Sequence, residues 1–108
     1  MTPRPFAIRV NDAVLADLHA RLERVRWPDE VPGAGWRYGA DLGYMKELVA
    51  YWRDRYDWRV HEARLNRLRQ FTVPLADIDL HFIHEPGVGP APRPLLLCHG
   101  WPGSIVEF

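Results

Sequence analysis

The sequence has only one cysteine, no excess charge of either sign and no apolar run long enough to cross a membrane. A lone cysteine cannot form an internal disulfide. Because Cys98 lies in an apolar run, we expect it to be buried as a small hydrophobic residue. Fourteen basic and fourteen acidic residues cancel, which removes the electrostatic basis for binding nucleic acid or an anionic membrane surface. No signal-peptide pattern opens the chain. We therefore expect a cytoplasmic protein with no nucleic-acid partner and no membrane segment.

The sequence does have a composition suited to a folded domain: 108 residues, 47% hydrophobic, with five tryptophans and ten prolines. The extended segment Phe6–Val10 is followed by Asn11 or Asp12, either of which can cap a helix. Asp41 can cap a second helix and Asp57 a third, because each precedes apolar residues at helical spacing. These helices predict a shared apolar face made of Leu18, Leu22, Leu48, Trp52, Trp58 and Leu65.

After Gln70 the pattern changes from helical spacing to alternation. Residues 71–75 and 78–82 alternate apolar and polar side chains around Ala76-Asp77, which predicts an antiparallel hairpin. Pro74 has no N–H to donate and favours an edge strand. Leu95–Cys98 is apolar at every position, as expected of a central strand covered on both faces. The sequence thus predicts an α/β fold with the helices first, then a hairpin, then one buried strand.

The apolar run breaks into the stretch HGWPGS, residues 99–104. Ser104 followed by Glu107 matches a capping box, so the pattern predicts a strand, a tight turn and the start of a helix. Ligands of open α/β sheets bind beside such turns, where free backbone N–H groups can stabilise an oxyanion. The alternative interpretation is an ordinary structural turn with a packed tryptophan.

Several motifs together resemble one family. They are HGWPGS, LHFIH before it, and upstream FAIRV, RWPDE, GAGWRYG, YWRDRYDWR and EARLNR. In this order they resemble the N-terminal region of epoxide hydrolases of the microsomal and juvenile-hormone type. The resemblance covers Phe6 to Phe108 and departs at the hairpin turn, where Ala76-Asp77 stands in place of a glycine common in relatives.

The resemblance implies an α/β-hydrolase fold with an N-terminal helical meander over residues 1–70 and the start of the hydrolase core over residues 71–108. It also implies that the backbone N–H of Trp101 forms part of the oxyanion hole. His99 and Gly100 would shape the turn and Pro102 would fix it; His99 is not the family's catalytic base. The nucleophilic aspartate, the histidine base with its acidic partner and the activating tyrosines have no match here. We therefore expect a truncated chain that is inactive by itself.

The implied reaction adds water to a small-molecule epoxide to give a vicinal diol through an aspartyl ester, a detoxification chemistry that needs no metal or organic cofactor. A homo-oligomer is left open. Two alternatives also remain: a non-catalytic helical module that docks on another subunit, and the N-terminal part of a different α/β-hydrolase, a dehalogenase or an esterase.

Overall fold

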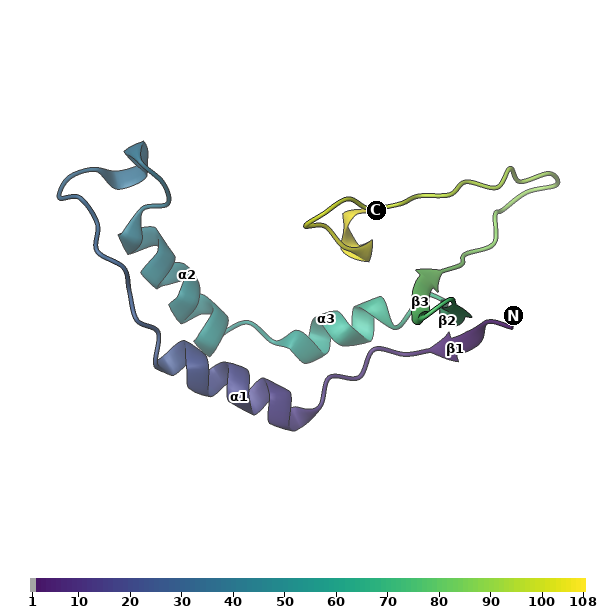
Figure 1. Ribbon diagram of the computed structural model, residues 1–108, viewed down its shortest axis with the longest axis horizontal. Coiled ribbons are helices and arrows are strands. Elements are labelled where there is room, and N and C mark those ends of the chain that lie inside the picture. The colour runs from purple at the N-terminus through teal and green to yellow at the C-terminus, as the bar shows by residue number, and fades with distance from the viewer. Residues whose placement is uncertain (1) are drawn as a thin grey trace. The chain divides into compact units, whose positions relative to one another are not determined.

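The computed structural model describes residues 2–108, which divide by their contacts into two units (Figure 1). One unit is formed by residues 9–59, the other by residues 2–8 together with 60–108. No helix within residues 2–108 is both long enough and apolar enough to cross a membrane. The boundary predicted at residue 70, between the helical meander and the start of the hydrolase core, stays a prediction. By contacts, the N-terminal strand belongs to the same unit as the hairpin. The elements are β1 (Arg4–Phe6), α1 (Asp12–Glu23), α2 (Leu42–Asp54), α3 (Trp58–Leu65), β2 (Gln70–Leu75) and β3 (Ile78–Ile83), with short 3-10 turns η1 (Gly35–Arg37) and η2 (Ile105–Glu107).

The helix starts follow the predicted caps. The Asn11 side-chain oxygen accepts a hydrogen bond from the N–H of Ala13 at 2.9 Å, at the beginning of α1. A carboxylate oxygen of Asp41 accepts from the N–H of Tyr44 at 2.7 Å, at the beginning of α2. Asp57 accepts from the N–H of the second residue of α3 at 2.8 Å. Each cap satisfies an N–H that has no partner inside its helix, and the predicted break before Asp57 is confirmed.

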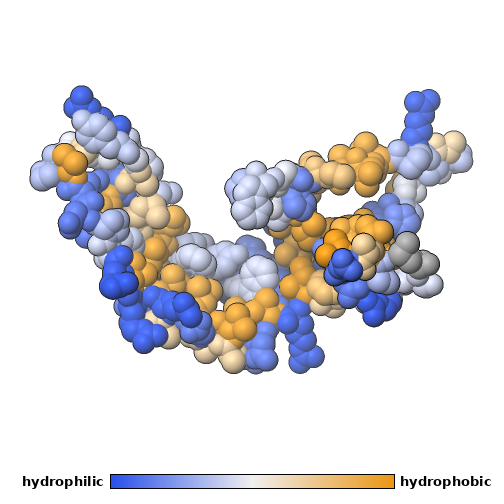
Figure 2. Space-filling model, in the orientation of Figure 1, coloured by the Kyte–Doolittle hydropathy of each residue, from blue (hydrophilic) through white to orange (hydrophobic). Residues whose placement is uncertain are grey.

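Helices α1 and α2 contact each other and form an apolar groove of about 670 Å³. Five of the six residues of the predicted apolar face line it: Leu18, Leu22, Leu48, Trp52 and Trp58. Figure 2 shows hydrophobic residues gathered along α2 and where α2 meets α1. Burial is less complete than the spacing predicts, because Leu22 is buried while Trp52 is 42% exposed. The helices bring their apolar sides together, but two short helices leave much of that surface uncovered.

The sheet is antiparallel, in the order β1-β2-β3. Its hairpin follows the predicted register, with Leu75 opposite Ile78 across a two-residue turn. The interpretation of Pro74 as a sign of an edge strand is wrong, because β1 also pairs with β2 and makes β2 the central strand. That pairing ends at Thr72 opposite Arg4. Pro74 lies beyond it, so the missing N–H costs the β1–β2 ladder no hydrogen bond.

A polar network fastens the N-terminal strand to the end of α3 and to the hairpin. The Asn66 side chain bonds both backbone groups of Ile8, accepting from its N–H and donating to its carbonyl, each at 2.8 Å. Gln70, only 3% exposed, donates to the carbonyl of Leu65 at 2.9 Å and lies 3.0 Å from Nε2 of His81. A buried amide is stable only when its polar atoms are satisfied, so this network fixes where β1 joins the sheet.

The hairpin turn carries the one non-glycine residue with a positive φ among residues 2–108, Ala76 at 51°. The left-handed conformation destabilises an L-residue by about 1–2 kcal/mol. Glycine removes this strain, although the larger conformational entropy of glycine in the unfolded chain offsets part of the gain. Ala76→Gly should therefore raise the free energy of unfolding by about 1 kcal/mol, measured by urea titration. The matched control is Ala16→Gly in the exposed interior of α1, which should lower it by about the same amount. Equal destabilisation by both changes would contradict the argument.

The predicted strand at Leu95–Cys98 is not formed in this chain. Residues 84–100 run on from β3 with no helix or strand (Figure 1), and Leu95 and Leu96 are 79% and 85% exposed. The physical reason is pairing: a strand apolar on both faces needs a neighbour on each side and layers above and below. Residues 2–108 place no strand beside it. Cys98, expected to be buried, is exposed for the same reason.

Candidate functional site

The HGWPGS stretch folds into a closed turn followed by one turn of 3-10 helix. The N–H of Gly103 donates to the carbonyl oxygen of Gly100 at 2.7 Å, and the peptide bond between Trp101 and Pro102 is cis. Ser104 caps η2, with its hydroxyl oxygen accepting from the N–H of Val106 at 3.3 Å. The predicted turn and serine cap are therefore confirmed. The helix that follows is the three-residue η2.

The peptide plane between Gly100 and Trp101 is the chemically informative part of the turn. Its carbonyl oxygen accepts from Gly103 and lies 3.1 Å from Nδ1 of His99. A trans peptide is planar, with its N–H pointing opposite to its C=O. Holding the Gly100 carbonyl inward therefore turns the Trp101 N–H outward. Within residues 2–108 this N–H has no hydrogen-bond acceptor, so it is available to an oxygen from elsewhere.

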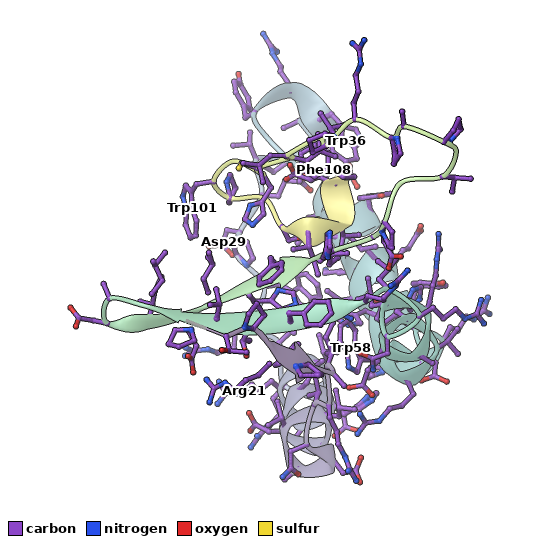
Figure 3. All side chains as sticks on the ribbon, turned by 90° about the vertical axis from the view of Figure 1, so that its right-hand side faces the viewer. Arg21, Asp29, Trp36, Trp58, Trp101 and Phe108 are labelled. Atoms are coloured by element: carbon purple, nitrogen blue, oxygen red, sulfur yellow. The ribbon has the colours of Figure 1, made fainter. Side chains whose placement is uncertain are left out.

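The Trp101 side chain takes no part in packing the turn. It is 97% exposed, and Figure 3 shows it projecting from the ribbon of the turn. The alternative interpretation, a structural turn built around a packed tryptophan, does not describe this arrangement. His99, Gly100 and Pro102 are also exposed, so the turn is held by its own hydrogen bonds. All four predicted site residues come together in one turn, as consecutive residues must.

Sequence reasoning missed the importance of Gly103. A Cβ built on this residue would overlap Oε1 of Glu107 and would lie 2.7 Å from the carbonyl oxygen of Gly100. The sequence does place a glycine after Pro102 and a glutamate four residues after that glycine. The capping-box pattern, however, relates Glu107 only to Ser104 and not to Gly103. Glycine is required here for close approach.

One carboxylate and one histidine of the hairpin are engaged in structural contacts. Asp79 pairs with Arg4 at 3.0 Å, and the His81 ring packs edge-on against Phe6 with ring centres 4.9 Å apart. No group of three or more histidine, cysteine or acidic residues within residues 2–108 is arranged to hold a metal ion. Within residues 2–108 the turn at residues 99–103 is therefore our candidate functional site.

Comparison with known proteins gives one consistent family. The family model "Epoxide hydrolase N terminus" matches residues 3–108. A protein of Stigmatella aurantiaca strain DW4/3-1, provisionally named an epoxide hydrolase, is 43% identical over 104 residues, covering 96% of this chain and 24% of its own length. Epoxide hydrolase 1 of Oryctolagus cuniculus is 38% identical over 109 residues, covering 97% of this chain and 24% of its own.

Solved structures agree with this result. The chain is similar to the epoxide hydrolase of Aspergillus niger, with a TM-score of 0.71 and 27% identity, over 77% of this chain and 22% of that one. Juvenile hormone epoxide hydrolase from Bombyx mori gives a TM-score of 0.72 at 22% identity, over 82% and 24%, and bears on the fold alone. The predicted fold class, a helical meander before the first strands of an α/β-hydrolase, is confirmed. The chain spans about a quarter of the length of these relatives.

Proposed function

The chain belongs to the epoxide hydrolase N-terminus family, and from that premise we propose that it forms the N-terminal part of an enzyme that converts an epoxide and water into a vicinal diol. The observation that carries the proposal is the outward Trp101 N–H, which has no acceptor within residues 2–108. We assign this N–H to the oxyanion hole. Its neighbours His99, Gly100 and Pro102 set the geometry of the turn and do not react.

The proposed reaction has two steps, and the nucleophile and base come from outside these 108 residues. In the first step, an aspartate oxygen attacks a ring carbon, the ring C–O bond breaks and the epoxide oxygen takes a proton from an activating tyrosine, which leaves a hydroxyalkyl ester and a tyrosinate. In the second, a histidine removes a proton from water, and the hydroxide adds to the ester carbonyl carbon. The resulting oxyanion collapses and expels the diol oxygen, which takes the proton held by the histidine. The new carboxyl group passes its proton back to the tyrosinate, which regenerates the aspartate carboxylate and the tyrosine.

Residues of this chain act in the second step. The ester carbonyl oxygen becomes negatively charged as hydroxide adds, and the Trp101 N–H would donate to it at that moment. A donor fixed before the charge develops needs no reorganisation during the reaction. The hydrogen bond from Gly103 to the Gly100 carbonyl supplies this fixation, because that carbonyl and the donating N–H share one rigid plane. No step requires a metal or organic cofactor, and we propose a cytoplasmic location and an epoxide as the small-molecule partner.

The test uses the full-length protein that carries this segment, with styrene oxide in ¹⁸O-labelled water. In a single turnover with enzyme in excess, the oxygen added to the ring comes from the aspartate, so the first diol should be unlabelled and the label should appear in the enzyme. Labelled diol on the first turnover would contradict the ester mechanism. Absence of diol, with release of halide from a haloalkane or alcohol from a simple ester instead, would favour a dehalogenase or an esterase.

A further inference from the structure

We infer that Glu107 is a positioning residue for the Trp101 N–H: its side chain occupies the open side of Gly103 and keeps the turn of residues 100–103 closed. The inference deepens the proposed function and rests on it, since the direction of that N–H matters to the reaction only if an oxyanion forms there. Glu107 lies beyond the turn itself, and no contact between its side chain and Trp101 is needed.

The Glu107 side chain leaves no room for a side chain at residue 103. The carboxylate of Glu107 lies where a side chain at residue 103 would stand: a Cβ on Gly103 would overlap Oε1 and would lie 2.6 Å from Cδ. The distance to Cδ is far below the ~3.5 Å or more at which nonbonded carbon atoms normally rest. The missing side chain of Gly103 and the carboxylate of Glu107 are therefore complementary, and Gly103 is half-buried as a result.

The backbone of Glu107 is itself held by a hydrogen bond. Its N–H donates to the carbonyl oxygen of Ser104 at 3.2 Å, and the Ser104 hydroxyl accepts from Val106. Ser104, the N-cap of η2, directly follows Gly103, and the single turn of η2 brings the Glu107 side chain back against Gly103. Two consecutive hydrogen-bonded segments, residues 100–103 and 104–107, therefore lie next to each other in the chain.

Gly103 connects Glu107 to the reacting group. The Gly103 N–H holds the Gly100 carbonyl at 2.7 Å, and that carbonyl shares its plane with the Trp101 N–H. If residue 103 swings toward the space that Glu107 fills, the carbonyl loses its donor and the N–H loses its fixed direction. Ring opening places its negative charge on the epoxide oxygen, whereas the oxyanion of the ester forms only in hydrolysis. The loss of Glu107 should therefore slow hydrolysis of the ester and leave its formation unchanged.

The experiment measures both steps in the full-length protein, by acid-quenched single turnovers of styrene oxide with mass detection of the ester. Glu107→Ala should slow ester hydrolysis about 10-fold, with unchanged ester formation and accumulation of the intermediate. Glu107→Gln keeps the shape of the side chain and should hydrolyse the ester at close to the wild-type rate. Val106→Ala, a neighbour in η2 whose side chain is 66% exposed, is the matched control and should behave as wild type. Gly103→Ala adds the clash with Gly100 and should slow hydrolysis about 100-fold, as expected for a misplaced group.

Each result decides the inference. Unchanged hydrolysis in Glu107→Ala would overturn it, and so would an equal loss in both steps together with a lower melting temperature, because that would indicate a general structural role. A Glu107→Gln variant as slow as Glu107→Ala would overturn the steric account. If Glu107→Ala does not fold, Glu107→Asp withdraws the carboxylate by one methylene and should show the same selective slowing, smaller in size. A wild-type protein that forms no ester is a different outcome, and overturns the proposed function itself.

Discussion

Styrene oxide incubated with the purified 108-residue chain is expected to give no diol above the rate in buffer. We propose that the chain supplies one backbone donor for the oxyanion, and we expect the family's nucleophile and base to come from outside these 108 residues. In serine hydrolases, loss of the nucleophile or the base lowers kcat by roughly 10⁶-fold. The measurement is chiral chromatography of the diol over several hours, with the full-length protein as the positive control.

Turnover by the isolated chain would require another site, and the hairpin is where one would be sought, since it carries Asp77, Asp79, His81 and His84. Two of these are already engaged: Asp79 with Arg4 at 3.0 Å, and His81 with the Gln70 side chain at 3.0 Å. A nucleophile and its base must be within hydrogen-bond reach of each other, and among these residues the structure gives no such pair. Diol production abolished by His81→Ala would nevertheless overturn this view.

Replacing Trp101 by proline in the full-length protein should slow ester hydrolysis about 100- to 1000-fold, equivalent to roughly 2.7–4 kcal/mol of transition-state stabilisation. Proline has no backbone N–H, so this change removes the proposed donor itself. Trp101→Phe and Trp101→Ala keep the N–H and should stay within a few-fold of the wild-type rate, because the indole is 97% exposed in this chain.

Single-turnover kinetics separate this effect from damage to the fold. The rate of ester formation is the internal control and should be unchanged in Trp101→Pro, while the ester accumulates. Thermal melting of the three variants checks that the turn does not unfold the protein, since proline also restricts the conformation of Gly100. A Trp101→Ala variant as slow as Trp101→Pro would mean that the indole side chain matters, and the backbone account would fail.

Features that depend on residues close together in the chain could be predicted from the sequence. The caps Asn11, Asp41 and Asp57 each bond an N–H within three residues, so residue type and position suffice to identify them. The hairpin is equally local, because alternation and a two-residue turn fix its register. The serine cap after the HGWP turn belongs to the same class.

Features that depend on distant residues could not be predicted. Pairing of β1 with β2 joins Phe6 to Gln70, and no local pattern in a three-residue strand names its partner. The apolar run 95–98 predicts a strand with other elements packed on both of its faces, but the run itself does not identify those elements. In this chain Leu95 is 79% exposed. The contact of Glu107 with Gly103 was missed for another reason: it depends on the path of the side chain and not on spacing alone.

The reciprocal hydrogen bonds between Ile8 and Asn66 have a consequence for how the chain can vary in length. They close residues 9–65 into a large loop whose two ends are held together at Ile8 and Asn66. The entropic free-energy cost of closing a flexible loop rises only with the logarithm of its length, by about 0.6 kcal/mol per doubling. Insertions between α1 and α2 should therefore accumulate in relatives at little thermodynamic cost, whereas a single inserted residue between Phe6 and Ile8 would shift β1 out of register with its fastening at Asn66.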